Sequence, residues 1–289
     1  MSSLVSASWL RDQLALPEAS DPARSHLRVL DARWYLSGKR GTDEYARGHL
    51  PGAAFVDLDR DLSAPKGEGP GRHPLPSARA FAAVLARLGV TATTTVVAYD
   101  DAGGAIAARV WWLLRHFGLR RGAVLDGGID AWTRAGGALT TEVPAIVPAP
   151  AMTLTARTDD VVDKGAVDAL RHDARAVILD ARSADRFEGK SEPVDARPGH
   201  IPGARSLPFA GNLTSPGGTF LDRDALAARL EAAGVRPGAT VVCYCGSGVT
   251  ACHDLLALAL TGRDDALLYE GSWSDWAADP TLPAALGPE

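Results

Sequence analysis

The sequence reads "GHLPGAAF" at residues 48–55 and "GHIPGARS" at residues 199–206. A short apolar segment precedes each of these turns, "VLDAR" at 29–33 and "ILDAR" at 178–182. The two sets of segments follow in the same order and are offset by roughly 150 residues. Self-similarity over such a distance predicts that one fold occurs twice in the chain.

The repeat extends through the rest of each half. The further matched segments are "ARAFAAVLARLGV" (78–90) with "RDALAARLEAAGV" (223–235), "TTTVVAYD" (93–100) with "GATVVCYC" (238–245), and "LDGGIDAW" (125–132) with "YEGSWSDW" (269–276). Between the halves, Pro144, Pro148 and Pro150 favour an extended connection over a helix. We therefore expect one domain over residues 1–143, a linker over 144–156 and a second domain over 157–289.

Each half alternates short apolar runs with helical patterns. Val29-Leu30 and residues 96–99 are typical of buried strands, whereas Phe81, Val84 and Leu85 follow the spacing of a one-sided helix. Such alternation predicts an α/β fold in which a parallel sheet is flanked by helices. Ligand sites in these sheets lie at the carboxyl ends of the strands.

The composition excludes several classes of protein. A chain of 289 residues, 46% hydrophobic and 22% charged, is long enough for two soluble domains. A net charge of −5 provides no basic surface for nucleic acid or an anionic membrane. We see no basic start followed by an apolar run, and three cysteines do not form a disulfide framework. We expect a cytoplasmic protein that binds neither nucleic acid nor membrane.

The segment "CYCGSGVTACH" at 243–253 joins a strand to a helix through a glycine-rich loop. Cys245 falls at the helix N-terminus, where unpaired N–H groups stabilise a thiolate. Gly246 and Gly248 permit backbone angles that turn successive N–H groups toward an anion. The loop therefore predicts a nucleophilic Cys245, provided that solvent reaches the sulfur and the amides point toward it.

Comparison of the halves separates structural from functional features. Asp100 replaces Cys245 in the first half, so the fold does not require the thiol. Features present twice are expected to maintain the fold, and we therefore expect His49 and His200 to brace the turns. Cys243 alternates with Cys245 along the strand and is expected in the core. The cysteine spacing does not match a zinc site, and we expect neither a metal nor a cofactor.

The duplicated halves, the two turns, the loop "CGSGVTACH" and the closing "YEGSWSDW" resemble the tandem-domain rhodanese-like sulfurtransferases, and more closely their 3-mercaptopyruvate sulfurtransferase branch. The resemblance spans nearly the whole chain. It implies a catalytically silent first rhodanese domain and an active second one, in which Cys245 accepts sulfur as a persulfide. It also implies a small-molecule sulfur donor, and an acceptor such as a thiol, thioredoxin or cyanide.

The resemblance assigns roles to further residues. Family members of the mercaptopyruvate type couple a loop serine to a histidine and an aspartate from the first domain, which indicates Ser247, His73 and Asp59. A donor carboxylate suits the planar fork of a guanidinium. Arg186 matches the substrate-binding position of the family, and Arg197 is a second candidate whose alignment is open because the segment before "PGHIPGA" is short.

The expected donor follows from charge. Relatives that prefer thiosulfate, a dianion, carry basic side chains after the cysteine, and no such side chain occurs among the loop residues expected to bind substrate: Gly246, Gly248, Val249 and Thr250. We therefore expect mercaptopyruvate, whose pyruvate enolate must then be protonated. Thiosulfate:cyanide transfer and a non-catalytic anion- or partner-binding module are the alternatives. A phosphatase is disfavoured because Ala251 stands where its loop requires arginine.

Overall fold

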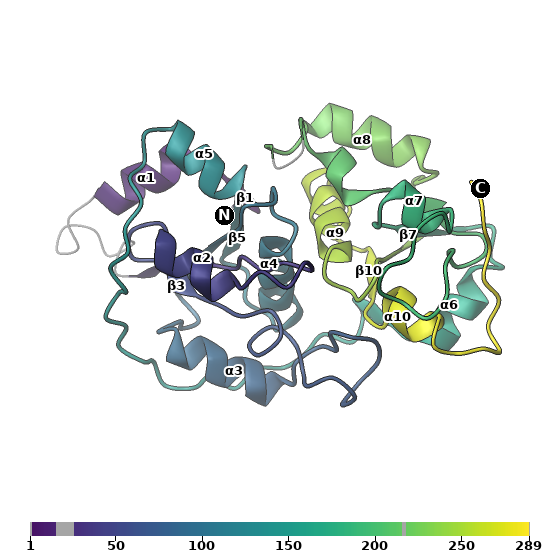
Figure 1. Cartoon of the computed structure of the whole chain (residues 1–289), viewed down its shortest axis with the longest axis horizontal. Coiled ribbons are helices and arrows are strands. Elements are labelled where there is room, and N and C mark those ends of the chain that lie inside the picture. Colours follow the sequence, from purple (N-terminus) through teal and green to yellow (C-terminus); the bar gives the residue numbers. More distant parts are fainter. Residues whose placement is uncertain (1, 16–25, 216–217, 289) are drawn as a thin grey trace. The chain divides into compact units, whose positions relative to one another are not determined.

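The computed structural model describes residues 2–15, 26–215 and 218–288. In this part of the chain two compact units form, and each contains a five-stranded parallel sheet flanked by helices (Figure 1). The prediction of an α/β fold in two tandem copies is confirmed.

The first unit carries its sheet in the order β1-β5-β4-β2-β3. Its elements are β1 (Leu4–Val5), α1 (Ala7–Ala15), β2 (Leu27–Asp31), α2 (Gly41–Arg47), β3 (Ala54–Phe55), α3 (Ala78–Arg87), β4 (Thr95–Tyr99), α4 (Ala107–His116), β5 (Gly122–Leu125) and α5 (Gly128–Arg134). The strands and the helix predicted from the first repeat correspond to β2, β4 and α3.

The second unit repeats this order as β6-β10-β9-β7-β8. Its elements are β6 (Val161–Val162), α6 (Lys164–Leu170), β7 (Ala176–Asp180), α7 (Ala184–Phe187), β8 (Arg205–Ser206), the 3-10 helix η2 (Phe209–Asn212), α8 (Arg223–Ala232), β9 (Thr240–Tyr244), α9 (Ala251–Leu260), β10 (Leu267–Tyr269) and α10 (Ser272–Trp276). The pairing of Asp180 with Tyr244 matches that of Asp31 with Tyr99.

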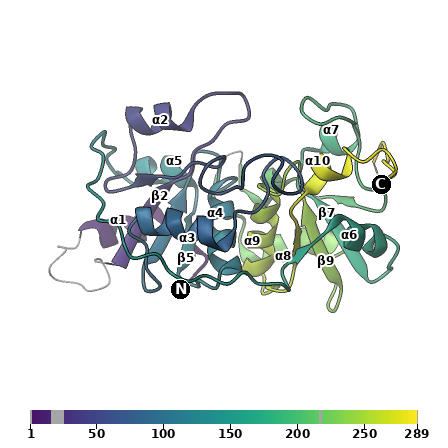
Figure 2. The same ribbon diagram turned by 90° about the horizontal axis from the view of Figure 1, so that it is seen from below.

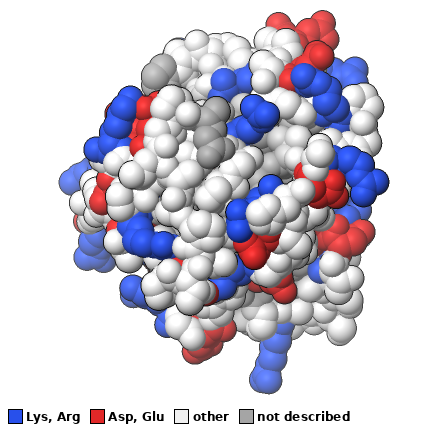
Figure 3. All heavy atoms as spheres, turned by 90° about the vertical axis from the view of Figure 1, so that its right-hand side faces the viewer, with Lys and Arg blue, Asp and Glu red and all other residues white. Residues whose placement is uncertain are grey.

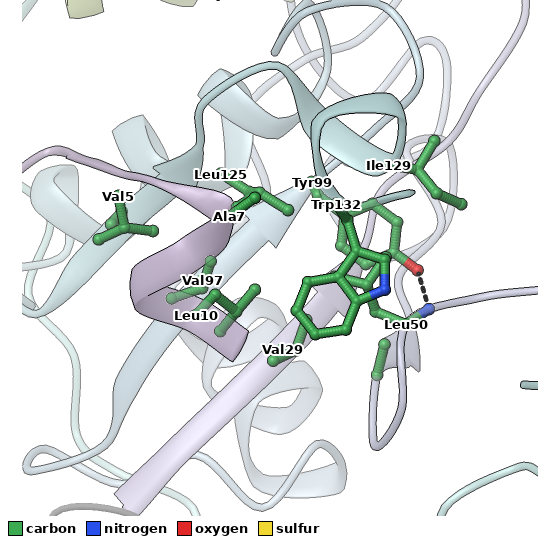
Figure 4. Packing of buried hydrophobic residues seen from close by; sticks show 12 residues of the cluster. Val5, Ala7, Leu10, Val29, Leu50, Val97, Tyr99, Leu125, Ile129 and Trp132 are labelled. Carbon is green, nitrogen blue, oxygen red and sulfur yellow. Dashed lines mark hydrogen bonds between the residues drawn. The ribbon is translucent and has the colours of Figure 1, made fainter. Parts of the chain in front are cut away.

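Apolar side chains cover both faces of the first sheet, as expected for parallel strands. Figure 4 shows α1 and α5 packed over one face; the labelled residues of this cluster are Val5, Ala7, Leu10, Val29, Leu50, Val97, Tyr99, Leu125, Ile129 and Trp132. Helix α4 packs along β4 and β5 (Figure 2), and Phe117 after α4 stacks on Phe81 of α3 at 5.2 Å between ring centroids. Successive side chains along a strand thus point to opposite faces of the sheet and pack against different helices.

A buried polar network explains the repeated "LDAR" motif in the first unit. The Arg33 guanidinium donates to the carboxylate of Asp31, at 2.6 Å for the closest pair, and to the carbonyl of Gly48 at 2.8 Å. The Tyr99 hydroxyl donates to Asp31 at 2.7 Å and accepts from the Leu50 amide at 3.1 Å, the bond drawn in Figure 4. The network therefore ties two central strands to the turn at 48–55.

The second unit contains the same network. Arg182 donates to Asp180 at 2.6 Å and to the carbonyl of Gly199 at 2.7 Å. The Tyr244 hydroxyl accepts from the Ile201 amide at 3.2 Å. Since buried charges must be paired, this set of residues is required in both copies whether or not the copy is catalytic.

The two turn histidines brace the fold, as predicted. The His49 ring lies within hydrogen-bonding distance of two carbonyls, with Nδ1 2.8 Å from Tyr45 O and Nε2 3.0 Å from Glu142 O. In the second unit His200 Nδ1 lies 2.7 Å from the carbonyl oxygen of Phe187. Each ring also stacks on an aromatic ring, that of Tyr45 or Phe187 respectively. Both histidines are therefore structural.

The units do not divide the chain at one point. Residues 144–156, all of them described, form neither helix nor strand, in keeping with the expected linker. The segment Ser63–Leu75, however, belongs to the second compact unit although it lies within the first half of the sequence. The domain boundaries at residues 143 and 157 stay a prediction. That prediction did not include the assignment of Ser63–Leu75, called the exchanged segment below, to the second unit.

The surface drawn in Figure 3 carries charges of both signs. Lys and Arg side chains lie among Asp and Glu side chains on this face. Binding of a polyanion depends on clustered basic residues. That this protein does not bind nucleic acid stays a prediction. Among the described residues, no helix has the length and apolar character needed to cross a membrane. The cellular location also stays a prediction.

We expect Arg33→Met to destabilise the first unit by about 3–5 kcal/mol, because it leaves the buried Asp31 carboxylate without its partner. Hydrogen–deuterium exchange should accelerate in β2 and β4 and stay unchanged in β7, which acts as an internal control. Arg40→Met is the matched control, because Arg40 is exposed and its loss should change stability by about 0.5 kcal/mol or less. Equal exchange in the two variants would contradict the assignment.

Candidate active site

The predicted nucleophile lies at the carboxyl end of a central strand. Cys245 directly follows β9, and the loop continues to Thr250, the N-cap residue of α9. The amide N–H of Ser247 donates to Cys245 Sγ at 3.5 Å. This contact agrees with the expected stabilisation of sulfur by a loop amide. Cys245 is only 2% exposed, so the expectation that solvent reaches the sulfur is not met in this structure. Its role as a nucleophile stays a prediction.

The segment before and within α10 holds this loop in place. The Cys245 amide donates to Ser272 Oγ at 3.1 Å, and the Cys245 carbonyl accepts from the Trp273 amide at 2.9 Å. The next carbonyl, that of Gly246, accepts from the Ser274 amide at 3.0 Å. Ser272 itself has a φ of 53°, an uncommon conformation for a residue other than glycine. The backbone around the sulfur is therefore positioned by main-chain contacts on both sides.

The loop requires glycine at residue 248. Gly248 has a φ of +76°, and a Cβ at this position would lie 2.5 Å from the carbonyl oxygen of Glu270. Both observations exclude a side chain, as the pattern predicted. Of the other expected loop residues, Val249 is buried and Thr250 is half-buried. Their contact with a substrate stays a prediction.

The corresponding loop of the first unit holds a carboxylate instead of a thiol. Asp100 accepts hydrogen bonds from the amides of Ala102, Gly104, Ile106 and Ala107, at 2.8–2.9 Å. Burial raises the pKa of Asp100, and the four amides act in the opposite direction. In the first unit, the backbone amides of the strand–loop–helix turn thus bind a carboxylate.

The other two cysteines are part of the core. Cys243 is fully buried, as predicted, and burial raises the pKa of its thiol well above the ordinary value. The Cys252 thiol is also buried and donates to the carbonyl of Gly248 at 3.4 Å. Across the residues that the structure describes, no group of three or more His, Cys, Asp or Glu side chains is arranged to hold a metal ion.

The predicted serine and histidine meet. His73 Nδ1 lies 2.7 Å from Ser247 Oγ, and both residues are buried. The loop that carries His73 is anchored on the segment before and within α10, since the Arg72 amide donates to Ser274 Oγ at 3.1 Å and the Leu75 amide to Glu270 Oε2 at 3.0 Å. A histidine at this distance can polarise a hydroxyl.

The third predicted member of this set, Asp59, belongs to the first unit. Its carboxylate accepts a hydrogen bond from Trp34 Nε1 at 2.9 Å. Both residues line a cavity of about 400 Å³ in that unit. The role assigned to Asp59, orienting His73, stays a prediction.

Two guanidinium groups lie beside the cysteine loop. A Cβ built on Gly246 would lie 3.0 Å from Arg72 Nη2 and 3.3 Å from Arg186 Nη1. Arg186 is one of the predicted substrate-binding residues. Arg72 was not predicted, although one signal was available: it precedes His73, a residue that has no counterpart in the second half.

The structure gives Arg197 a different set of contacts. Its guanidinium donates to four main-chain carbonyls, those of Trp276, Ala277, Asp279 and Leu282, at 2.9–3.2 Å. These bonds hold the chain that follows α10. The substrate-binding role expected for Arg197 is therefore not supported by its contacts, and Arg72 lies where a second guanidinium was expected.

The geometry agrees with comparisons to known proteins. A family model described as "Rhodanese-like domain" matches residues 6–135 and 163–279. The chain belongs to the rhodanese-like family. Rhodanese-like domains therefore occupy both halves, and only the second has a cysteine at the end of its central strand.

Relatives of this rhodanese-like protein are sulfurtransferases. A Pseudomonas aeruginosa protein named for 3-mercaptopyruvate sulfurtransferase is 43% identical, and the alignment covers 98% of this chain and 99% of that one. SseB of Mycobacterium tuberculosis, named for thiosulfate sulfurtransferase, is 42% identical over 93% of both chains. The crystal structure of SseA from Escherichia coli, solved in a study of 3-mercaptopyruvate sulfotransferases, has a TM-score of 0.80 at 32% identity and covers 95% of this chain and 100% of that one. The protein is a sulfurtransferase.

We expect Gly248→Ala to destabilise the second unit more than Gly238→Ala. Both glycines have positive φ, so both substitutions carry the cost of about 1–2 kcal/mol for a left-handed residue. At Gly238 nothing lies within 4 Å of the added Cβ, whereas at Gly248 the carbonyl of Glu270 must shift. Urea unfolding midpoints and the iodoacetamide reactivity of Cys245 measure the difference. If the two variants behave alike, the loop geometry described above is wrong.

Proposed function

We propose that the protein transfers sulfur from 3-mercaptopyruvate to a thiol acceptor through a persulfide on Cys245. The hydrogen-bonded pair of His73 and Ser247 beside the cysteine loop is the observation that carries this proposal. A thiosulfate donor requires no proton on carbon, whereas mercaptopyruvate does. A buried acid–base pair next to the nucleophile therefore favours the keto-acid donor.

The first step forms an S–S bond and breaks a C–S bond. The Cys245 thiolate attacks the thiol sulfur of the donor, and the electron pair of the C–S bond passes to the carbon as a pyruvate enolate. The proton of the donor thiol balances the charge when it is delivered to that carbon. The products are pyruvate and Cys245 persulfide.

Ser247 and His73 provide a route for this proton. Hydrogen bonding to His73 allows the Ser247 hydroxyl to give up a proton to the enolate carbon and to regain one from the imidazole. Asp59 is the proposed group that orients the imidazole, as the family resemblance implies.

Arg186 and Arg72 are the proposed partners of the donor carboxylate. A guanidinium binds a carboxylate through two parallel N–H···O bonds, and two guanidinium groups beside Gly246 bring such a donor within reach of the neighbouring cysteine. The amides of residues 246–250 are the proposed receptacle of the persulfide anion. The four amides around Asp100 in the first unit support this role.

In the second step the acceptor attacks the outer sulfur of the persulfide. The S–S bond of Cys245 breaks, and its electron pair restores the thiolate. A small thiol or thioredoxin becomes a persulfide, and cyanide becomes thiocyanate. These acceptors are proposals from the family resemblance.

Thiosulfate transfer is the second candidate. The pair of guanidinium groups at Arg72 and Arg186 supports it, because a dianion gains from two positive charges. The relative SseB, 42% identical, is named for this donor. We expect kcat/KM to be higher for mercaptopyruvate than for thiosulfate when the two are assayed side by side. A strong preference for thiosulfate would reverse the donor and leave the nucleophile unchanged.

Treatment with mercaptopyruvate should add one sulfur atom to Cys245, detected by mass spectrometry of the peptide. Cys245→Ser should show no added sulfur and no turnover, because the nucleophile is absent. Cys243 and Cys252 stay in this variant as internal controls. Sulfur found on either of them, or turnover by the variant, would contradict the assignment of the nucleophile.

We expect Ser247→Ala and His73→Gln to lower kcat with mercaptopyruvate by about 10²–10⁴-fold, the usual contribution of general acid–base catalysis. The rate with thiosulfate should fall much less, since sulfite leaves without a proton on carbon. His172→Gln is the control, because His172 is exposed. Equal losses with both donors would indicate that the pair only positions the loop.

A further inference from the structure

Arg186 binds two carboxylates that are held in different ways. It donates to Glu192 at 2.7 Å and to Asp195 at 3.0 Å. Glu192 also accepts from Arg182 at 3.2 Å and from the amides of Val194 and Asp195 at 3.1 and 3.0 Å. Burial alone acts to raise the pKa of Glu192, but the bonds from Arg186 and the amides overcome it, so the pKa is lowered. Glu192 is therefore a fixed part of the fold.

The Asp195 side chain is buried, 4% exposed, and is held differently from Glu192. The contacts described for its side chain are with two guanidinium groups, those of Arg72 and Arg186. Burial raises the pKa of Asp195, the charge of Arg72 opposes this, and the nearby charge of Glu192 adds to the rise. The ionised form of the Asp195 carboxylate is therefore less favourable in the fold than it would be in water. Because guanidinium groups hold this side chain, the carboxylate of a donor can accept the same hydrogen bonds in its place.

The place that Asp195 occupies is beside the nucleophile. Both of its guanidinium partners lie next to Gly246, the residue that follows Cys245. Their side chains are only partly exposed, 21% for Arg72 and 17% for Arg186. Residues 190–199, which carry Asp195, form neither helix nor strand. The Asp195 amide is nevertheless bonded to Glu192 at 3.0 Å, so the exchange proposed below concerns the Asp195 side chain and not its backbone.

We propose that Asp195 is an internal competitor for the carboxylate of the donor: it occupies the fork formed by Arg72 and Arg186 in the free enzyme, and the donor displaces it. This inference rests on the proposed function, since it assumes a donor with a carboxylate. It makes Asp195 a residue that sets the KM for such donors, and Arg72 the second guanidinium of the binding site.

The test uses Asp195→Asn in the full chain, because asparagine keeps the size of the side chain and removes its charge. Asp185→Asn is the matched control: it makes the same change in net charge on α7 at an exposed residue. The first measurement is the ratio of the alkylation rates of Cys245 by iodoacetate and by iodoacetamide. This ratio reports recognition of a carboxylate beside the sulfur, and it requires no turnover. The second measurement is kcat and KM with mercaptopyruvate.

We expect Asp195→Asn to raise the iodoacetate to iodoacetamide ratio, and to lower KM, by about five- to tenfold with kcat little changed. This is the size expected if the fork is open in roughly a tenth of the free molecules. The control should change neither quantity by more than a small factor. In the double variant Arg72→Gln/Asp195→Asn, both the rise in the alkylation ratio and the fall in KM should disappear. Asp195→Ala gives the same test should the asparagine variant not fold.

An unchanged ratio, or a higher KM in Asp195→Asn, would overturn the proposal and make Asp195 a positioning residue for the two arginines. Failure of the proposed function looks different. In that case the wild-type enzyme does not turn over mercaptopyruvate, yet the alkylation ratio still reports whether Asp195 competes for the fork.

Discussion

A buried ion pair connects the core of the second unit to the candidate site. Arg182 binds Asp180 at the carboxyl end of β7, lies 4.8 Å from the centroid of the Trp273 ring, and also donates to Glu192. Glu192 in turn binds Arg186. Because an unpaired charge in the core costs several kcal/mol, this chain of contacts is constrained by folding itself. The direction in which Arg186 faces is thus determined by the same residues that hold the sheet together.

The two repeats place different anions at the same turn. In the first unit the turn closes on its own side chain, the carboxylate of Asp100, which receives four backbone N–H groups. In the second unit a sulfur stands at that position, and the Ser247 amide donates to it. A cysteine sulfur can be extended by a further sulfur atom, whereas a carboxylate that already has its hydrogen bonds cannot take up a group for transfer. At this turn the two copies therefore differ in the chemistry of one side chain, Asp100 or Cys245.

Much of the fold could be predicted from the sequence because the repeat is internal and its motifs are local. The "LDAR" segments and the turns after them recur because each needs the other to pair its buried charges. The nucleophile and its loop were equally accessible, since strand, glycines and helix are adjacent in the chain. The pairing of Arg72 with Asp195 was not, because 123 residues separate them in the sequence. Arg197 shows another limit: its alignment with the family was open, and the sequence could not show that carbonyl oxygens of the C-terminal segment accept from its guanidinium.

The exchanged segment Ser63–Leu75 makes the candidate site depend on both halves of the sequence. It lies in the first half of the sequence but belongs to the second compact unit, where it supplies His73 and Arg72. A deletion that retained only the latter half would keep a complete sheet and its cysteine, yet would remove an imidazole and a guanidinium from beside the sulfur. The half of the chain without a thiol at this turn thus supplies a loop on which the candidate site of the other half depends.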